Sequence, residues 1–195
     1  MNDITMLEEA RSSALQDIGR NVVAFQKMEA MIKFLIASHR IEGLPEELAR
    51  ISEQQRLDVD RLTMGNLVDR LFSSVLVDGS DAKAEPNTSA ETMSITFSIE
   101  LEAEAHSDTR EAFRLIVRER NALIHQMLVS FNPNSLESCK EISKVLADQR
   151  NRLKPRFDDL RNIVRTILDG QKELQAWVES DDFVLALKEA GSCEH

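Results

Sequence analysis

The chain has 195 residues, of which 34 are acidic and 24 are Lys or Arg, and its formal net charge is -10. This length fits one compact domain, and a mixture of 42% hydrophobic and 30% charged residues is typical of a folded protein rather than a disordered one. The excess of negative charge argues against a protein that coats nucleic acid or an anionic membrane, so any such binding must be local.

The beginning of the chain carries acidic residues and lacks the apolar run of a secretory signal, so we expect a cytoplasmic protein. We expect no membrane span, because the stretch 121–139, in which Glu137 is the one charged residue, contains a histidine, a proline and several amides. Cys139 and Cys193 lie in no zinc-binding or redox spacing, and the histidines form no cluster with them. We therefore expect no metal ion and no other cofactor.

The scarcity of chain breakers, with 6 Gly and 4 Pro, favours long helices. The sequence predicts an all-α fold, a bundle of long antiparallel helices in a single domain over residues 1–195. In the first helix the apolar stripe consists of Ile18, Val22, Phe25, Ile32 and Ile36. The predicted helices cover residues 3–40, 45–57, 63–75, 108–131, 136–178 (with Pro155 as the position of any kink) and 181–190.

One region differs from this helical pattern. Residues 78–92 are rich in small and polar side chains, which predicts a flexible loop. Apolar and polar residues then alternate from Met93 to Leu101, which is the pattern of a strand. Its partner is either the segment 74–77 across the loop or a second subunit.

The most informative segment is 117–128, with the sequence VRERNALIHQML. On a helical wheel Arg120 lies at the centre of an apolar face, and a buried guanidinium is costly unless a carboxylate accompanies it. Glu29 is the one acid at the centre of the first helix's apolar stripe, so we predict that Glu29 and Arg120 are in contact or share a water. The apolar neighbours of Arg120 on this wheel are Phe113, Ile116, Val117, Ile124, Met127 and Phe131.

A second, polar stripe follows the same helix and consists of Arg110, Arg114, Arg118, Asn121 and His125. The last two are one turn apart, so the amide can hydrogen-bond the imidazole and fix its tautomer. Together these groups suit binding of a phosphodiester and transfer of a proton. The alternative for this stripe is an ordinary solvated face. We expect the later cluster of Arg150, Arg152, Lys154 and Arg156 to be solvated surface, and its alternative is to widen a groove at a dimer cleft.

The segment Arg120-Asn121-Ala122-Leu123-Ile124-His125 resembles the R-x4-H motif of the HEPN superfamily, in the form with a polar residue directly after the arginine. The resemblance implies a small helical domain with metal-independent RNA endonuclease activity, in which two domains bring two motifs into one cleft. It implies that His125 is the general base or acid, that Arg120 stabilises the phosphorane, and that Asn121 orients the histidine or the substrate. Glu29 would support the arginine, and Arg114 and Arg118 would contact RNA.

The resemblance further implies a HEPN-like bundle, a homodimer, a single-stranded RNA substrate, and an antitoxin or another protein as partner. In one subgroup a tyrosine two residues after the histidine is modified by a partner enzyme. Here that position is Met127 and the chain contains no tyrosine, so this mode of control is excluded. The competing hypothesis is a noncatalytic helical interaction module in which the RNALIH segment only packs helices.

Overall fold

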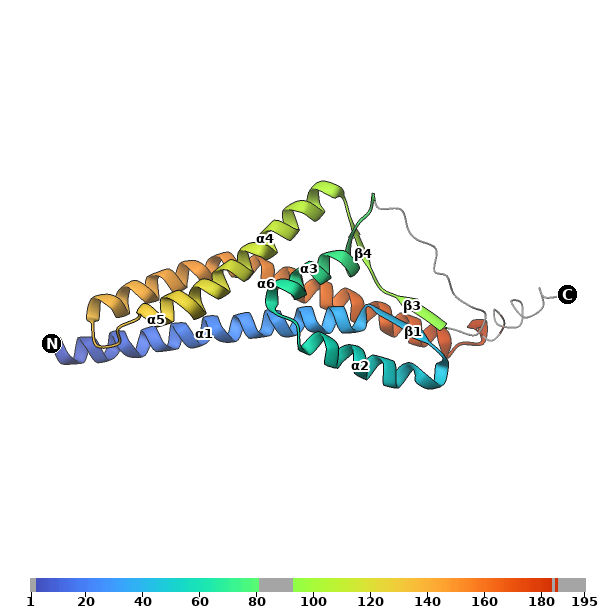
Figure 1. The fold of residues 1–195 in the computed structure, drawn as a ribbon, viewed down its shortest axis with the longest axis horizontal. Coiled ribbons are helices and arrows are strands. Elements are labelled where there is room, and N and C mark those ends of the chain that lie inside the picture. The colour runs from blue at the N-terminus through green and yellow to red at the C-terminus, as the bar shows by residue number, and fades with distance from the viewer. Residues whose placement is uncertain (1–2, 81–92, 184, 186–195) are drawn as a thin grey trace.

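The computed structural model describes residues 3–80, 93–183 and 185. It confirms a mainly α-helical fold with minor short strands. The two longest helices, α1 (Asp3–Ser38) and α6 (Leu136–Val178), lie side by side along the longest axis of the molecule (Figure 1). The described helices include none with an apolar stretch long enough to cross a membrane.

The shorter helices pack against this pair. The predicted ends agree with the observed ones to within a few residues, except that the fourth helix begins at Ala103 rather than near residue 108. The α6 helix begins after Ser135, whose hydroxyl accepts a hydrogen bond from the Ser138 amide at 3.2 Å, and it continues through Pro155. The remaining helical elements are the 3-10 turn η1 (Pro45–Glu47), α2 (Leu48–Asp60), α3 (Met64–Ser74), α4 (Ala103–Ala122), the π-helical turn η2 (Leu123–Met127) and α5 (Leu128–Ser130).

The two longest helices run parallel to each other. At one end Arg11 donates to the Pro133 carbonyl at 2.8 Å, and at the other Gln171 donates to the Ser38 carbonyl at 3.4 Å. The expected antiparallel arrangement does hold for α4 and α6, which are joined by the short connection 131–135 and lie in opposite directions (Figure 1). The N-terminal helix can be parallel to α6 because the rest of the chain separates them.

The contact between α1 and α6 follows a seven-residue repeat, as in a coiled coil. The buried residues of α6 on this repeat are Cys139, Leu146, Leu153, Leu160 and Ile167. Those of α1 are Ala14, Asn21, Met28 and Leu35. The repeat is visible in the sequence, but the stripe predicted for α1 is displaced toward its neighbouring face, since Ile18 and Val22 are only partly buried.

A buried pair of amides interrupts this apolar seam. Asn21 and Gln149 are both 0% exposed, and the Asn21 Nδ2 group donates to Gln149 Oε1 at 2.7 Å and to the Leu146 carbonyl at 3.0 Å. Gln149 Nε2 in turn donates to the carbonyl of Glu119 in α4 at 3.2 Å. Two side chains therefore join α1, α6 and α4.

The predicted strand is confirmed, and it forms two short elements. β3 (Met93–Thr96) pairs antiparallel with β1 (Arg40–Gly43), and β4 (Ile99–Leu101) pairs in parallel with β2 (Leu76–Asp78). The second partner lies close to the predicted segment 74–77. The first was missed, because residues 40–43 read as the end of the first helix and its stop signal.

Two predictions fall largely on parts of the chain that the structure does not describe. The loop predicted at 78–92 lies outside the described residues from residue 81 onward. Most of the helix predicted at 181–190 also lies outside them.

Replacing Asn21 by alanine is expected to lower the free energy of unfolding by about 2–3 kcal/mol, because Gln149 Oε1 then loses its donor in a buried place. Urea denaturation measures this free energy. We expect the slope m of the free energy against urea concentration to stay unchanged. The matched control is Asn162→Ala at an exposed site of α6, for which we expect a change of about 0.5 kcal/mol or less. Equal effects of the two substitutions would contradict a stabilising role for the amide pair.

Candidate functional site

The RNALIH segment lies where α4 changes into the π-helical turn η2. Within this turn the Leu128 amide donates to the Leu123 carbonyl five residues earlier. In a regular α-helix a four-residue step from Asn121 to His125 overshoots one turn by about 40°. A π turn contains more residues, so it reduces this overshoot and brings the His125 position closer to alignment with Asn121.

The three motif residues differ in exposure and in partners. Asn121 and His125 are exposed, whereas Arg120 is partly buried and donates from Nη1 to Asn121 Oδ1 at 3.2 Å. The expected hydrogen bond between Asn121 and His125 is not formed. The imidazole of His125 has no hydrogen-bond or ion-pair partner among the described residues, so both of its nitrogens are available to a ligand.

The predicted contact between Glu29 and Arg120 is wrong. Glu29 instead pairs with Lys33 on the next turn of α1 at 3.1 Å, and Lys33 also lies 3.7 Å from the Asp60 carboxylate at the end of α2. Arg120 is partly buried, but its long side chain carries the guanidinium to Asn121. No acid from α1 is then required.

The acid that sequence reasoning missed is the neighbour of Arg120. Glu119 has a side chain only 12% exposed, and its Oε1 accepts from Arg152 Nε of α6 at 2.6 Å. Its other oxygen, Oε2, is buried without a hydrogen-bond partner in the described part of the chain. Arg152 belongs to the cluster that we expected to be solvated surface. The spacing of residues within this cluster does not indicate that one of its arginines contacts α4.

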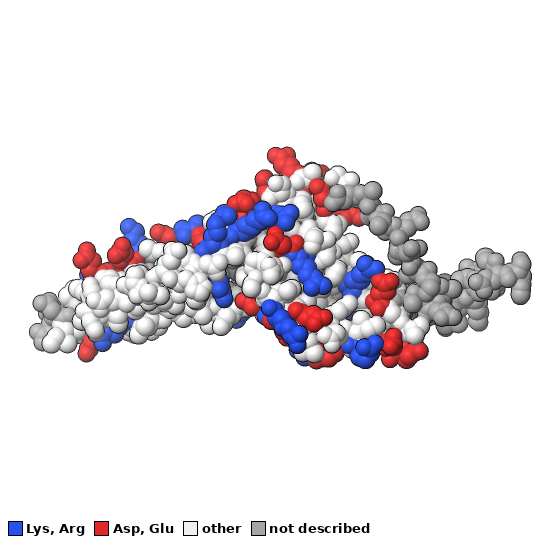
Figure 2. Space-filling model, viewed as in Figure 1, with Lys and Arg blue, Asp and Glu red and all other residues white. Residues whose placement is uncertain are grey.

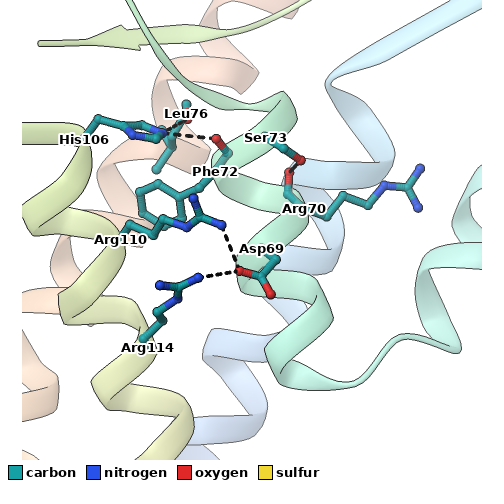
Figure 3. A network of polar contacts seen from close by, with 8 residues as sticks. All are labelled: Asp69, Arg70, Phe72, Ser73, Leu76, His106, Arg110 and Arg114. Atoms are coloured by element: carbon teal, nitrogen blue, oxygen red, sulfur yellow. Dashed lines mark hydrogen bonds and ion pairs between the residues drawn. The ribbon is translucent and has the colours of Figure 1, made fainter. Parts of the chain in front are cut away.

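The arginine stripe on α4 is held by acids on two elements. Arg110 and Arg114 both donate to Asp69 Oδ1 of α3, at 3.1 and 3.3 Å (Figure 3). The guanidinium of Arg110, aided by that of Arg114, lowers the pKa of Asp69 below its ordinary value. Arg118 pairs with Glu111 at 2.8 Å, and this hydrogen bond lowers the pKa of Glu111.

The start of α4 is fixed to the end of α3 by a histidine. His106 Nε2 donates to the carbonyls of Phe72 and Leu76, at 3.1 and 3.0 Å, and its ring packs edge-on against that of Phe72 (Figure 3). Because both acceptors are carbonyls, this nitrogen carries the proton. The contact fixes where the arginine stripe begins relative to Asp69.

The charge on this face of the molecule is unevenly distributed. Figure 2 shows basic side chains gathered over α4 and α3, whereas the arm made by the first half of α1 and by α5 carries few charges. Arg114 and Arg118 remain 49% and 58% exposed in spite of their ion pairs. A basic band therefore leads along α4 toward Asn121 and His125.

We found no match to this chain among protein-family models, among curated proteins or among solved structures. The described residues contain no group of three or more His, Cys, Asp or Glu side chains that could hold a metal ion.

Substitutions of two arginines distinguish the observed ion pair of Arg152 with Glu119 from the predicted pair of Arg120 with Glu29. We expect Arg152→Ala to lower the free energy of unfolding by about 2 kcal/mol, because it leaves the Glu119 carboxylate nearly buried and without its cation. Arg120→Ala removes a half-exposed hydrogen bond and should cost about 1 kcal/mol or less. Chemical denaturation of the two variants beside the wild type measures both values. A larger loss for Arg120→Ala than for Arg152→Ala would contradict the observed pairing.

Proposed function

We propose that this protein is a HEPN-type RNA endonuclease that requires no metal ion and acts as a homodimer. The observation that carries the proposal is the π-helical turn at the end of RNALIH. It presents His125 exposed, and without a partner among the described residues, next to the paired Arg120 and Asn121. Single π turns inside α-helices occur frequently at functional sites. The alternative is a noncatalytic interaction module with the same fold.

The chemistry of RNA cleavage explains why these residue types belong together. His125 removes the proton of a 2'-hydroxyl, the oxygen forms a bond to the adjacent phosphorus, and the bond from phosphorus to the 5'-oxygen breaks. The products are a 2',3'-cyclic phosphate and a free 5'-hydroxyl. The Arg120 guanidinium stabilises the charge that develops on the phosphorane, and Asn121 holds that guanidinium through its Oδ1 atom.

The number of proton-transfer groups that the reaction needs supports a homodimer. The reaction needs one group to accept a proton and another to donate one to the leaving oxygen. Of the other histidines that the structure describes, His39 and His106 bond to backbone carbonyls elsewhere in the fold, so the described part of one copy supplies one histidine to the site. A twofold axis near His125 would supply the second.

A set of neutral residues on α1 supports such an axis. Among the exposed residues of this helix, Ser12, Leu15, Gln16, Gly19 and Gln26 are small or neutral, whereas Glu8, Glu9, Arg20 and Lys27 are charged. Leu15 is 53% exposed, and Val129 of α5, four residues after His125, is 79% exposed. Exposed apolar side chains of this size among neutral residues are typical of a protein interface.

The basic band supports RNA as the substrate. Arg110, Arg114 and Asp69 together carry one net positive charge, because two guanidinium groups share one carboxylate. Their ion pairs hold the guanidinium groups in place while leaving them accessible to phosphate oxygens. An antitoxin or another protein that covers this band and His125 would inhibit the enzyme.

The test of activity is cleavage of a labelled single-stranded RNA by purified protein with EDTA present. We expect the wild type to release products with 2',3'-cyclic phosphate ends and His125→Ala to lose at least about 100-fold in rate, since general acid–base catalysis contributes about 10²–10⁴-fold. Gln126→Ala is the matched control, because it alters the adjacent exposed residue of the same turn and should keep the activity. Identical thermal melting of the three proteins excludes a loss of fold.

The test of the composite site is the oligomeric state. Leu15→Arg should convert the dimer to a monomer in sedimentation and abolish cleavage, whereas Leu57→Arg, at a 42% exposed site of α2, should do neither. An active monomer would contradict the shared cleft. A stable dimer that cleaves no RNA would favour the noncatalytic module instead.

A further inference from the structure

A groove between α1 and α6 is a concave feature that the proposed nuclease site does not use. All of its lining residues come from these two helices, and its volume is about 560 Å³. Its floor is apolar and consists of Val23, Ala24, Met28, Leu153 and Phe157. Val23 is 46% exposed, although valine is usually buried.

The charged residues that line this groove are all basic. Its charged residues are Arg20, Lys27, Arg150 and Lys154, and no acid is among the lining residues. This is unexpected in a chain with a formal net charge of -10. The groove is therefore a local positive region on an acidic protein.

Two of these cations are held in place and two are free to bind. Arg150 donates to Asp17 Oδ1 at 2.8 Å, and Arg20 lies 3.5 Å from the same oxygen, so two guanidinium groups share one nearly buried carboxylate. Lys27 on α1 and Lys154 on α6 have no ion-pair or hydrogen-bond partner among the described residues. The two lysines belong to different helices, so each lies along one side of the apolar floor.

We propose that this groove binds an acidic amphipathic helix of a partner protein. Two packed helices leave a groove into which the apolar face of a third helix fits, with anchors at positions i, i+3, i+4 and i+7. Aspartate or glutamate residues that flank those anchors would meet Lys27 and Lys154. Charge complementarity then selects the partner, and burial of Val23 and Phe157 supplies the affinity. This inference does not depend on the proposed nuclease activity.

The composition of the floor favours a helix over RNA. Single-stranded nucleic acid binds on grooves in which successive bases stack on aromatic rings. Phe157 is the one aromatic residue of this groove, and the other four floor residues are aliphatic or methionine. Aliphatic side chains and methionine instead suit the leucines and isoleucines of a partner helix.

The probe for the test is a synthetic helical peptide of about 20 residues, long enough to hold helical structure, with leucines at the anchor positions and glutamates beside them. Its counterpart carries lysines in place of the glutamates. By fluorescence anisotropy we expect the acidic peptide to bind the wild-type protein and the basic peptide to bind at least about 10-fold more weakly. Binding of the acidic peptide should weaken as salt is raised.

Lys27→Glu combined with Lys154→Glu should weaken binding of the acidic peptide by at least about 10-fold. Lys140→Glu combined with Lys144→Glu changes the charge of the chain equally at two exposed lysines of α6 and should leave binding unchanged. Both double variants alter exposed side chains, and thermal melting checks that they fold. Equal weakening by the two pairs would overturn the proposal, since it would show attraction to the whole chain and not to the groove.

Three further outcomes would also overturn it. One is the absence of acidic-peptide binding at millimolar concentration. Another is loss of self-association in the Lys27/Lys154 variant, which would assign the groove to a second copy of this chain. The third is binding of a single-stranded RNA that depends on Lys27 and Lys154 while the acidic peptide does not compete, which would make the groove a nucleic-acid site.

Discussion

The hydrogen bond between Asn21 and Gln149 is the interaction on which the arrangement of the long helices depends. Apolar residues at seven-residue spacing would allow α1 and α6 to slide by one repeat with little loss of burial. A buried amide pair permits one alignment, because any shift leaves a donor or an acceptor without a partner in an apolar environment. These two residues therefore fix the register of α1 against α6.

The same glutamine connects this register to the candidate site. Gln149 donates to the carbonyl of Glu119, and three residues later Arg152 binds the Glu119 side chain. Both contacts hold the residue that directly precedes Arg120. The end of α4 is consequently anchored on α6 immediately before the helix widens into the π turn that carries His125. Packing at the centre of the molecule thus determines how the RNALIH segment is presented.

The distribution of charge explains how an acidic chain exposes basic surfaces. Asp17, Asp69 and Glu119 each bind an arginine of another helix. Asp69 binds two such arginines, and Asp17 binds a second arginine, Arg20, on its own helix. Where one carboxylate pairs with two guanidinium groups, the group of three carries a net positive charge. The band along α4 and the rim of the groove between α1 and α6 both arise in this way. Net charge describes the whole chain, but binding depends on these local sums.

The sequence by itself determined the helical fold, most helix ends, the strand after residue 92 and the polar stripe that includes His125, because these features depend on neighbours a few residues apart. Only the tertiary structure decided which charges meet. A helical wheel gives the direction of each Cβ, whereas a long side chain such as Arg120 can carry its charge to another face. The parallel direction of α1 and α6, the partner strand at 40–43 and the basic groove equally depend on contacts between segments that are 50 or more residues apart. Local periodicity contains no information about which distant segment completes such a contact.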